Sequence, residues 1–202
     1  MLLSAGIQPS KQIFIHGFIN SGGQKMSKSL GNVIDPLVVA EDFGIDALRY
    51  FLLREIPSYE DGDFTMDRFR ETYNANLANG LGNLVSRVMR MSEQYLELRI
   101  MNYELRIEIP NEIQNALEKY QFDRAMDFIW GRVQELDRKI QETEPFKLVK
   151  TDEAKAKEIL RELVTGMYEI GNWLAPFLPA TSETILAAVQ SNKKPENLFS
   201  RR

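Results

Sequence analysis

Apolar side chains recur at steps of three or four residues through the middle of the chain. A period near 3.6 residues places such side chains on one helical face, so the run predicts one long amphipathic helix from Asp67 onward. A helix of this length needs other helices against its apolar stripe, and we therefore expect a mainly α fold. The stripe consists of Phe69, Tyr73, Leu77, Leu81, Leu84, Val88, Met91, Tyr95 and Leu98.

Two more helices are predicted from similar periodic runs, and each run stops at a proline. The helix predicted from the run over residues 126–140 ends at Pro145, and the one predicted from residues 159–173 ends before Pro176. Proline ends a helix because it lacks the N–H and its ring clashes with the preceding turn. Thr181 is placed to cap a last short helix. About five helices with short links favour an antiparallel bundle over residues 67–202. The Asn-, Lys- and Pro-rich tail is expected to form a surface strap.

The preceding segment, residues 35–66, is predicted to be a compact linker. Asp35 followed by proline is a helix start, and Gly44 is a suitable end for that helix. Asp46 is predicted to cap a second helical segment over residues 47–54. An acidic tract, Glu60-Asp61-Gly62-Asp63, follows.

The first 34 residues contain lysines but no Asp or Glu. Residues 13–19 are predicted to form a short buried strand, and the Gly- and Ser-rich stretch after it a mobile loop. Since a single strand needs sheet partners, we expect residues 1–34 to be an α/β stub at the end of a domain whose main part is missing.

The amino-acid composition limits which functional sites the chain can form. With no cysteine and one histidine, a metal site is not expected. The net charge of −4 means that any RNA contact must use a local basic face. No apolar run is long enough to span a bilayer and no signal peptide is recognisable, so we expect a cytoplasmic protein without a membrane partner.

The stretch Lys25-Met26-Ser27-Lys28-Ser29 carries the clearest chemistry. Two ammonium groups and two hydroxyl groups in a glycine-flanked loop could close over a polyphosphate and stabilise departing pyrophosphate. A solvated linker is the alternative. The stretch resembles the KMSKS signature of class I aminoacyl-tRNA synthetases, which favours function.

Four further stretches resemble the methionyl-tRNA synthetases, and the resemblance covers nearly the whole chain. The segment from the acidic tract into the long helix is the most specific. The four stretches are His16-Gly17-Phe18, Asp46-Ala47-Leu48-Arg49-Tyr50, Leu53-Arg54-Glu55 and Asp61-Gly62-Asp63-Phe64. The last of them leads into Asn74 to Asn79 and Leu81-Gly82-Asn83-Leu84, and the resemblance runs on through Trp173-Leu174-Ala175-Pro176-Phe177-Leu178-Pro179.

The resemblance implies the C-terminal part of a methionine–tRNA ligase with a class I anticodon-binding bundle. Lys28 and Lys25 would be catalytic, and with Ser27 and Ser29 they would bind ATP, which carries Mg²⁺ in the full enzyme. The HIGH signature that clamps ATP has no counterpart here. We therefore expect a fragment or subunit that is inactive alone and acts on ATP and methionine only with the missing catalytic domain, as a monomer or paired with a catalytic subunit.

A polar ribbon runs along the long helix beside the apolar stripe. It consists of Asn76, Asn79, Asn83, Arg87 and Arg90, whose amide and guanidinium groups suit the bases and phosphates of a single-stranded loop. A solvated face is the alternative. In the family that the chain resembles, the positions of Asn83 and Arg87 read the anticodon of tRNA(Met).

The third anticodon-reading position of that family is a tryptophan after a proline, and here Phe146 follows Pro145. Phenylalanine can stack on a base but offers no indole N–H. Two other readings of the whole chain stay open: a non-catalytic tRNA-binding subunit or module with a vestigial loop, and a purely structural bundle.

Three other conspicuous side chains are expected to pack rather than react. His16, in the predicted strand over residues 13–19, lacks a Ser or Cys partner for a triad. Trp130 and Trp173 lie at core-like helical spacing.

Overall fold

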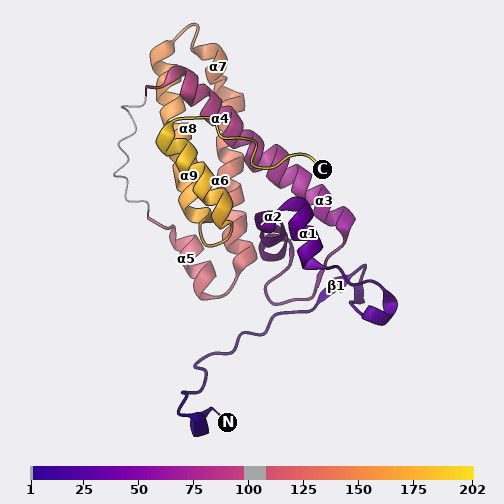
Figure 1. Ribbon diagram of the computed structural model, residues 1–202. Helices are drawn as coiled ribbons and strands as arrows, with labels where there is room; N and C mark the ends of the chain where they lie inside the picture. The colour runs from indigo at the N-terminus through magenta and orange to yellow at the C-terminus, as the bar shows by residue number, and fades with distance from the viewer. Residues whose placement is uncertain (1, 98–107) are drawn as a thin grey trace.

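The computed structural model describes residues 2–97 and 108–202. They form a helical bundle with a small sheet at one end and an extended N-terminal arm that runs away from it (Figure 1). The predicted mainly α fold is confirmed. None of the described helices is both long and apolar enough to cross a membrane.

The predicted long helix is continuous through three segments. It comprises α3 (Met66–Thr72), a π-helical stretch (Tyr73–Gly82) and α4 (Asn83–Tyr95). Thr65 caps its start, with its hydroxyl accepting a hydrogen bond from the Arg68 N–H at 3.3 Å. The apolar stripe from Phe69 to Met91 is buried as predicted, and Leu98 lies outside the described residues.

The remaining helices of the bundle confirm the two proline stops. The helix α6 ends before Pro145 and α8 before Pro176, while the short helices α5 and α7 were not predicted. Their bounds are α5 (Asn111–Glu118), α6 (Phe122–Thr143), α7 (Pro145–Leu148), α8 (Glu153–Leu174) and α9 (Pro179–Ser191).

Two helices, α1 (Pro36–Phe43) and α2 (Ile45–Tyr50), connect the sheet to the bundle, and a π-helical stretch (Phe51–Glu55) continues α2. Asp35 caps α1 as predicted, accepting a hydrogen bond from the Leu37 N–H at 2.9 Å. Gly44 ends α1, also as predicted.

Two cap predictions are wrong. Asp46 lies inside α2 and does not cap it, and Thr181 lies in the first turn of α9, which begins at Pro179. Instead, the buried Asp46 carboxylate accepts hydrogen bonds from both the Thr181 N–H and its hydroxyl at 2.7 Å. Sequence spacing could not reveal this contact because the two residues lie far apart in the chain.

The sheet has the order β2-β1-β3, with β1 (Ile19–Ser21) antiparallel to β2 (Gln24–Lys25) and parallel to β3 (Gly62–Asp63). The predicted buried strand over residues 13–19 is wrong in both extent and burial. Ile13 and Ile15 are each 78% exposed and lie before β1, because among the described residues they have nothing to pack against.

The tail after α9 returns along the long helix as a strap, as predicted (Figure 1). Tyr73 donates its hydroxyl hydrogen to the Ser200 carbonyl at 2.8 Å, and Asn74 exchanges two hydrogen bonds with the backbone of Arg202. These contacts place the strap, residues 193–202, across the π-helical stretch.

Candidate functional site

The lysine loop is a hairpin rather than an unstructured loop. Gly22 and Gly23 connect β1 to β2 with φ angles of 64° and 73°, the left-handed conformation that a two-residue hairpin turn of this kind requires and glycine adopts without strain. Lys25 ends β2, and a single 3₁₀ turn begins at Lys28. Both lysine side chains are exposed on the same short segment.

Asn32 fastens the base of this segment. Its side-chain oxygen accepts a hydrogen bond from the Ser27 N–H at 2.8 Å, and its amide donates to the Lys25 carbonyl at 3.3 Å. The hydroxyl oxygens of Ser27 and Ser29 lie 2.8 Å apart. The four predicted ATP-binding residues thus lie on one segment fastened at its base. The role of Asn32, three residues after the motif, was missed.

The acidic tract holds the other side of the hairpin, a role that sequence reasoning also missed. The Asp61 carboxylate accepts from the Phe18 N–H at 2.7 Å, and the Asp63 carboxylate accepts from the Gly23 N–H at 2.9 Å. Gly17 makes the close approach possible, because a Cβ there would lie 2.1 Å from the Glu60 carbonyl oxygen. Carboxylates accept strong hydrogen bonds from backbone N–H groups. The alternation of Asp and Gly in the acidic tract was the sequence signal that could have indicated this role.

The polar ribbon is divided by the strap. Asn79 accepts a hydrogen bond from the Arg201 Nε at 2.8 Å, so this part of the ribbon faces the tail. Asn83 is exposed beside a hollow of about 280 Å³ between the long helix and the strap, and Arg90 is also exposed. The Asn79 side-chain oxygen is thus engaged by the strap, and Asn83 and Arg90 are exposed members of the ribbon beyond it.

Arg87 forms an ion pair across the bundle. Its Nη1 atom lies 2.7 Å from the Asp137 Oδ1 atom on α6. The side chains of both residues remain 35% exposed. The guanidinium group is therefore held at the surface and is accessible to a ligand.

Phe146 lies in the first turn of α7, at the end of the bundle toward which α4 runs (Figure 1). Its ring is exposed, at 43%, and the Lys147 Nζ atom lies 5.8 Å from the ring centroid. An exposed aromatic ring beside a cation is suited to stacking on a nucleobase.

His16 is exposed and does not pack in the core, so that interpretation is wrong. Its Nδ1 atom lies 2.7 Å from the neighbouring Gly17 carbonyl oxygen. His16 belongs to the N-terminal arm, which precedes β1 in the chain. By contrast, Trp130 and Trp173 are buried as predicted.

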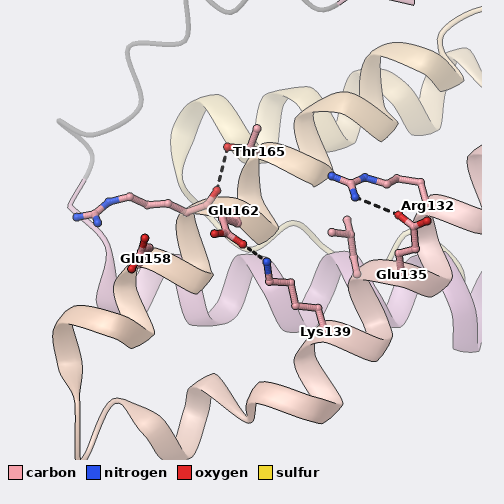
Figure 2. A pocket seen from close by; sticks show the side chains of 8 residues that line it. Arg132, Glu135, Lys139, Glu158, Glu162 and Thr165 are labelled. Atoms are coloured by element: carbon pink, nitrogen blue, oxygen red, sulfur yellow. Dashed lines mark hydrogen bonds and ion pairs between the residues drawn. The ribbon is translucent and has the colours of Figure 1, made fainter. Parts of the chain in front are cut away.

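A hollow of about 580 Å³ between α6 and α8 carries charges of both signs (Figure 2). Arg132 pairs with Glu135 at 3.1 Å and with Glu169 at 2.9 Å, while Lys139 pairs with Glu162. The pairs of Arg132 with Glu169 and of Lys139 with Glu162 join the two helices, whereas Arg132 and Glu135 both lie on α6. A groove whose cations already face carboxylates is poorly suited to an anionic ligand, so we regard it as structural.

Comparison with known proteins supplies the family. Residues 1–89 match the model of the class I tRNA synthetases (M). The chain is 37% identical over 92% of its length to a methionine–tRNA ligase of Clostridium acetobutylicum, and 36% identical over 98% to one of Fusobacterium nucleatum. It covers 31% and 33% of those two proteins, so it spans about a third of their length.

Comparison with solved structures agrees with the comparison of sequences. All of the chain superposes on 45% of a Mycobacterium tuberculosis methionyl-tRNA synthetase, solved in complex with methionyl-adenylate, with a TM-score of 0.76 and 27% identity. By sequence and by fold together, the chain is a homologue of the methionine–tRNA ligases over about a third of their length, and its first 89 residues match the class I tRNA synthetases.

Proposed function

We propose that the chain supplies two parts of a methionine–tRNA ligase: a pyrophosphate-stabilising loop and a bundle that reads the anticodon of tRNA(Met). The reaction is the ATP-dependent attachment of methionine to tRNA. The domains are residues 1–34 as the end of the catalytic domain, 35–66 as a linker and 67–202 as the anticodon-binding bundle. The chain acts with a nucleotide-binding region and is inactive without it, in the cytoplasm.

The observation that carries the catalytic part is the exposure of Lys25 and Lys28 on a hairpin fastened by Asn32 and Asp63. Pyrophosphate gains negative charge as it leaves the α-phosphate of ATP. Two ammonium groups carried on one fastened segment can stabilise that charge. Ser27 and Ser29 add hydroxyl donors, and Mg²⁺ enters as part of the ATP substrate.

The anticodon-reading part uses Asn83, Arg87 and Phe146. Their amide, guanidinium and aromatic groups are all open to solvent on the bundle. Bases of a single-stranded loop can stack on the ring and accept or donate hydrogen bonds at the polar groups. The phenylalanine supports stacking alone, since it has no N–H to donate.

The catalytic proposal is tested by Lys28→Ala in the full-length enzyme, or in this chain reassembled with its nucleotide-binding region. ATP–pyrophosphate exchange is expected to fall roughly 10²-fold or more, as for loss of one preorganised donor, with tRNA affinity unchanged. Lys11→Ala, at an exposed cation outside the hairpin, is the matched control. Unchanged exchange in the Lys28 variant would instead support the non-catalytic module with a vestigial loop.

Arg87→Ala tests the anticodon proposal in this chain alone. Binding of an RNA hairpin with a CAU loop is expected to weaken by about 1–3 kcal/mol, as for a lost specific base contact. Equal affinity of the wild-type chain for hairpins with any loop sequence would contradict anticodon reading.

A further inference from the structure

The ion pair between Arg87 and Asp137 joins the proposed anticodon-reading helix α4 to α6. The contact is short, at 2.7 Å, but both side chains remain 35% exposed. Solvent screens pairs of this kind, and they add little to the stability of a fold. We therefore explain the pair by its effect on the orientation of the Arg87 side chain, since its contribution to the stability of the bundle is small.

The Asp137 carboxylate is itself held in place. Its Oδ2 atom accepts a hydrogen bond from the Gln141 amide at 2.5 Å, one helical turn further along α6. Its Oδ1 atom faces Arg87. Because both carboxylate oxygens are engaged, the acid presents a fixed edge to the guanidinium group.

Arg87 retains capacity to donate elsewhere. A guanidinium group carries five N–H donors in one plane, and the contact with Asp137 uses Nη1. A group held along one side presents its other donors in a set direction. A planar fork of donors can pair at two points with the edge of a base, which carries sequence information, or with a phosphate, which does not. The comparison of two loop sequences described below separates these cases.

A hollow of about 330 Å³, lined in part by polar side chains, lies beside the pair. Its lining comes from the long helix and from α6: Asn79, Gly80, Val133, Gln134, Asp137, Arg138 and Gln141. It lies on the other side of α6 from the mixed-charge groove of Figure 2, since Gln134 and Asp137 are roughly half a turn from Arg132 and Lys139 at about 100° per residue. The hollow offers amide and guanidinium groups at the point where Arg87 is held.

We propose that Asp137 is a positioning residue, which holds the Arg87 guanidinium at the rim of this hollow in the orientation that reads an RNA base. The proposal rests on the anticodon-reading function proposed for Arg87. It excludes the opposite role, in which the Asp137 carboxylate competes with RNA for Arg87. The two roles predict opposite changes in affinity when the carboxylate is removed.

The experiment measures binding of this chain to an RNA hairpin with a CAU loop and to the same hairpin with a scrambled loop. Asp137→Ala is expected to weaken CAU binding roughly tenfold, within the usual range of coupling between contacting residues, and to reduce discrimination between the loops. Asp137→Glu, which keeps the carboxylate, should restore much of both. Glu142→Ala, at an exposed acid on the same helix, is the matched control and should bind normally.

A double-mutant cycle tests whether Asp137 affects RNA binding through Arg87. In the Arg87→Ala background, Asp137→Ala should cause little further loss. Equal or tighter CAU binding by Asp137→Ala, or an equal loss in both backgrounds, overturns the positioning role. If Arg87→Ala itself has no effect, the anticodon proposal fails; if only Asp137→Ala has none, that proposal stands and this inference fails.

Asp137→Asn guards against a folding defect. The amide keeps the shape of the side chain and an acceptor for Arg87 but lacks the charge, so intermediate affinity is expected. An affinity equal to that of Asp137→Ala despite a wild-type unfolding curve would show that charge rather than shape holds Arg87. An affinity above the wild-type value would overturn the proposal.

Discussion

The buried carboxylate of Asp46 accepts two hydrogen bonds from Thr181, one from its backbone N–H and one from its hydroxyl, both at 2.7 Å. The contact ties α2 to the first turn of α9, where backbone N–H groups have no partner within the helix. A negative charge is also favourable at this end of a helix. One side chain thereby fixes the linker against the far end of the bundle.

Asp46→Ala is expected to lower the free energy of unfolding by about 1–3 kcal/mol, because the Thr181 N–H and hydroxyl would stay buried without a partner. Urea unfolding followed by circular dichroism measures the change. Asp42→Ala, at an exposed acid on the neighbouring helix α1, is the control and should change stability little. A loss no greater than that of the control would show that the contact does not tie the helices.

Asp63→Ala is expected to loosen the lysine hairpin without unfolding the bundle. The Asp63 carboxylate accepts from the Gly23 N–H at 2.9 Å, and β3 continues directly into the capped start of the long helix. Hydrogen exchange at the Gly23 amide should accelerate roughly tenfold, since a hydrogen bond to a charged acceptor contributes about 1.5–3 kcal/mol when intact and less at a solvated site.

Asp67→Ala, at an exposed acid in α3, is the comparison for Asp63→Ala. Exchange at amides within α4 should be unchanged in both variants. An unchanged Gly23 rate in Asp63→Ala would mean that the turn is held by its glycines alone.

The longer helices could be predicted because their causes are local in sequence, whereas the short helices α5 and α7 were missed. Prolines ended α6 and α8, and Asp35 capped α1 as predicted. The sheet could not be predicted, because β1 pairs with a two-residue strand more than forty positions away, at Gly62. Strands this short carry no periodic signal.

The candidate site shows the same division. Lys25 and Lys28 were identified from five adjacent letters and are exposed together. Their supports, Asn32 and Asp63, were not identified, because a side-chain amide or carboxylate that accepts a hydrogen bond from a backbone N–H looks in sequence like any polar loop residue. The partner of Arg87 on α6 was missed for the same reason.

Phe199→Ala is expected to detach the strap and destabilise the chain by roughly 1–2 kcal/mol, since the ring is half-buried and only part of its transfer energy is lost. The Phe199 ring meets Tyr73 edge to face at 6.0 Å, next to the Tyr73 hydroxyl bond to Ser200. Chemical denaturation is the measurement, with the exposed strap residue changed in Asn197→Ala as control. Equal stability of the two variants would show that the strap is not anchored by this ring.

Tyr50 should make stability fall at alkaline pH. Burial raises the pKa of its hydroxyl well above the usual value of about 10, although the charge of Arg54 opposes the rise. The folded chain therefore holds this proton at pH values where the unfolded chain has lost it. The contribution is complete below about pH 10 and is lost as the pH rises from there through the folded pKa, by at most about 1.4 kcal/mol per pH unit.

Tyr50→Phe removes the proton and with it this part of the pH dependence. The unfolding free energy of the wild-type chain should fall more steeply than that of the variant between pH 10 and pH 11, while lysines and other tyrosines contribute equally to both. At pH 8 the free energy of unfolding of the variant should be lower by about 1 kcal/mol. Phenylalanine lacks the hydroxyl oxygen that accepts a hydrogen bond from the Arg54 Nη1 atom at 2.5 Å in the wild-type chain. Parallel curves for the two chains would mean that Tyr50 ionises equally readily in the folded and unfolded states, so that its burial against Trp130 and Arg54 has no electrostatic consequence.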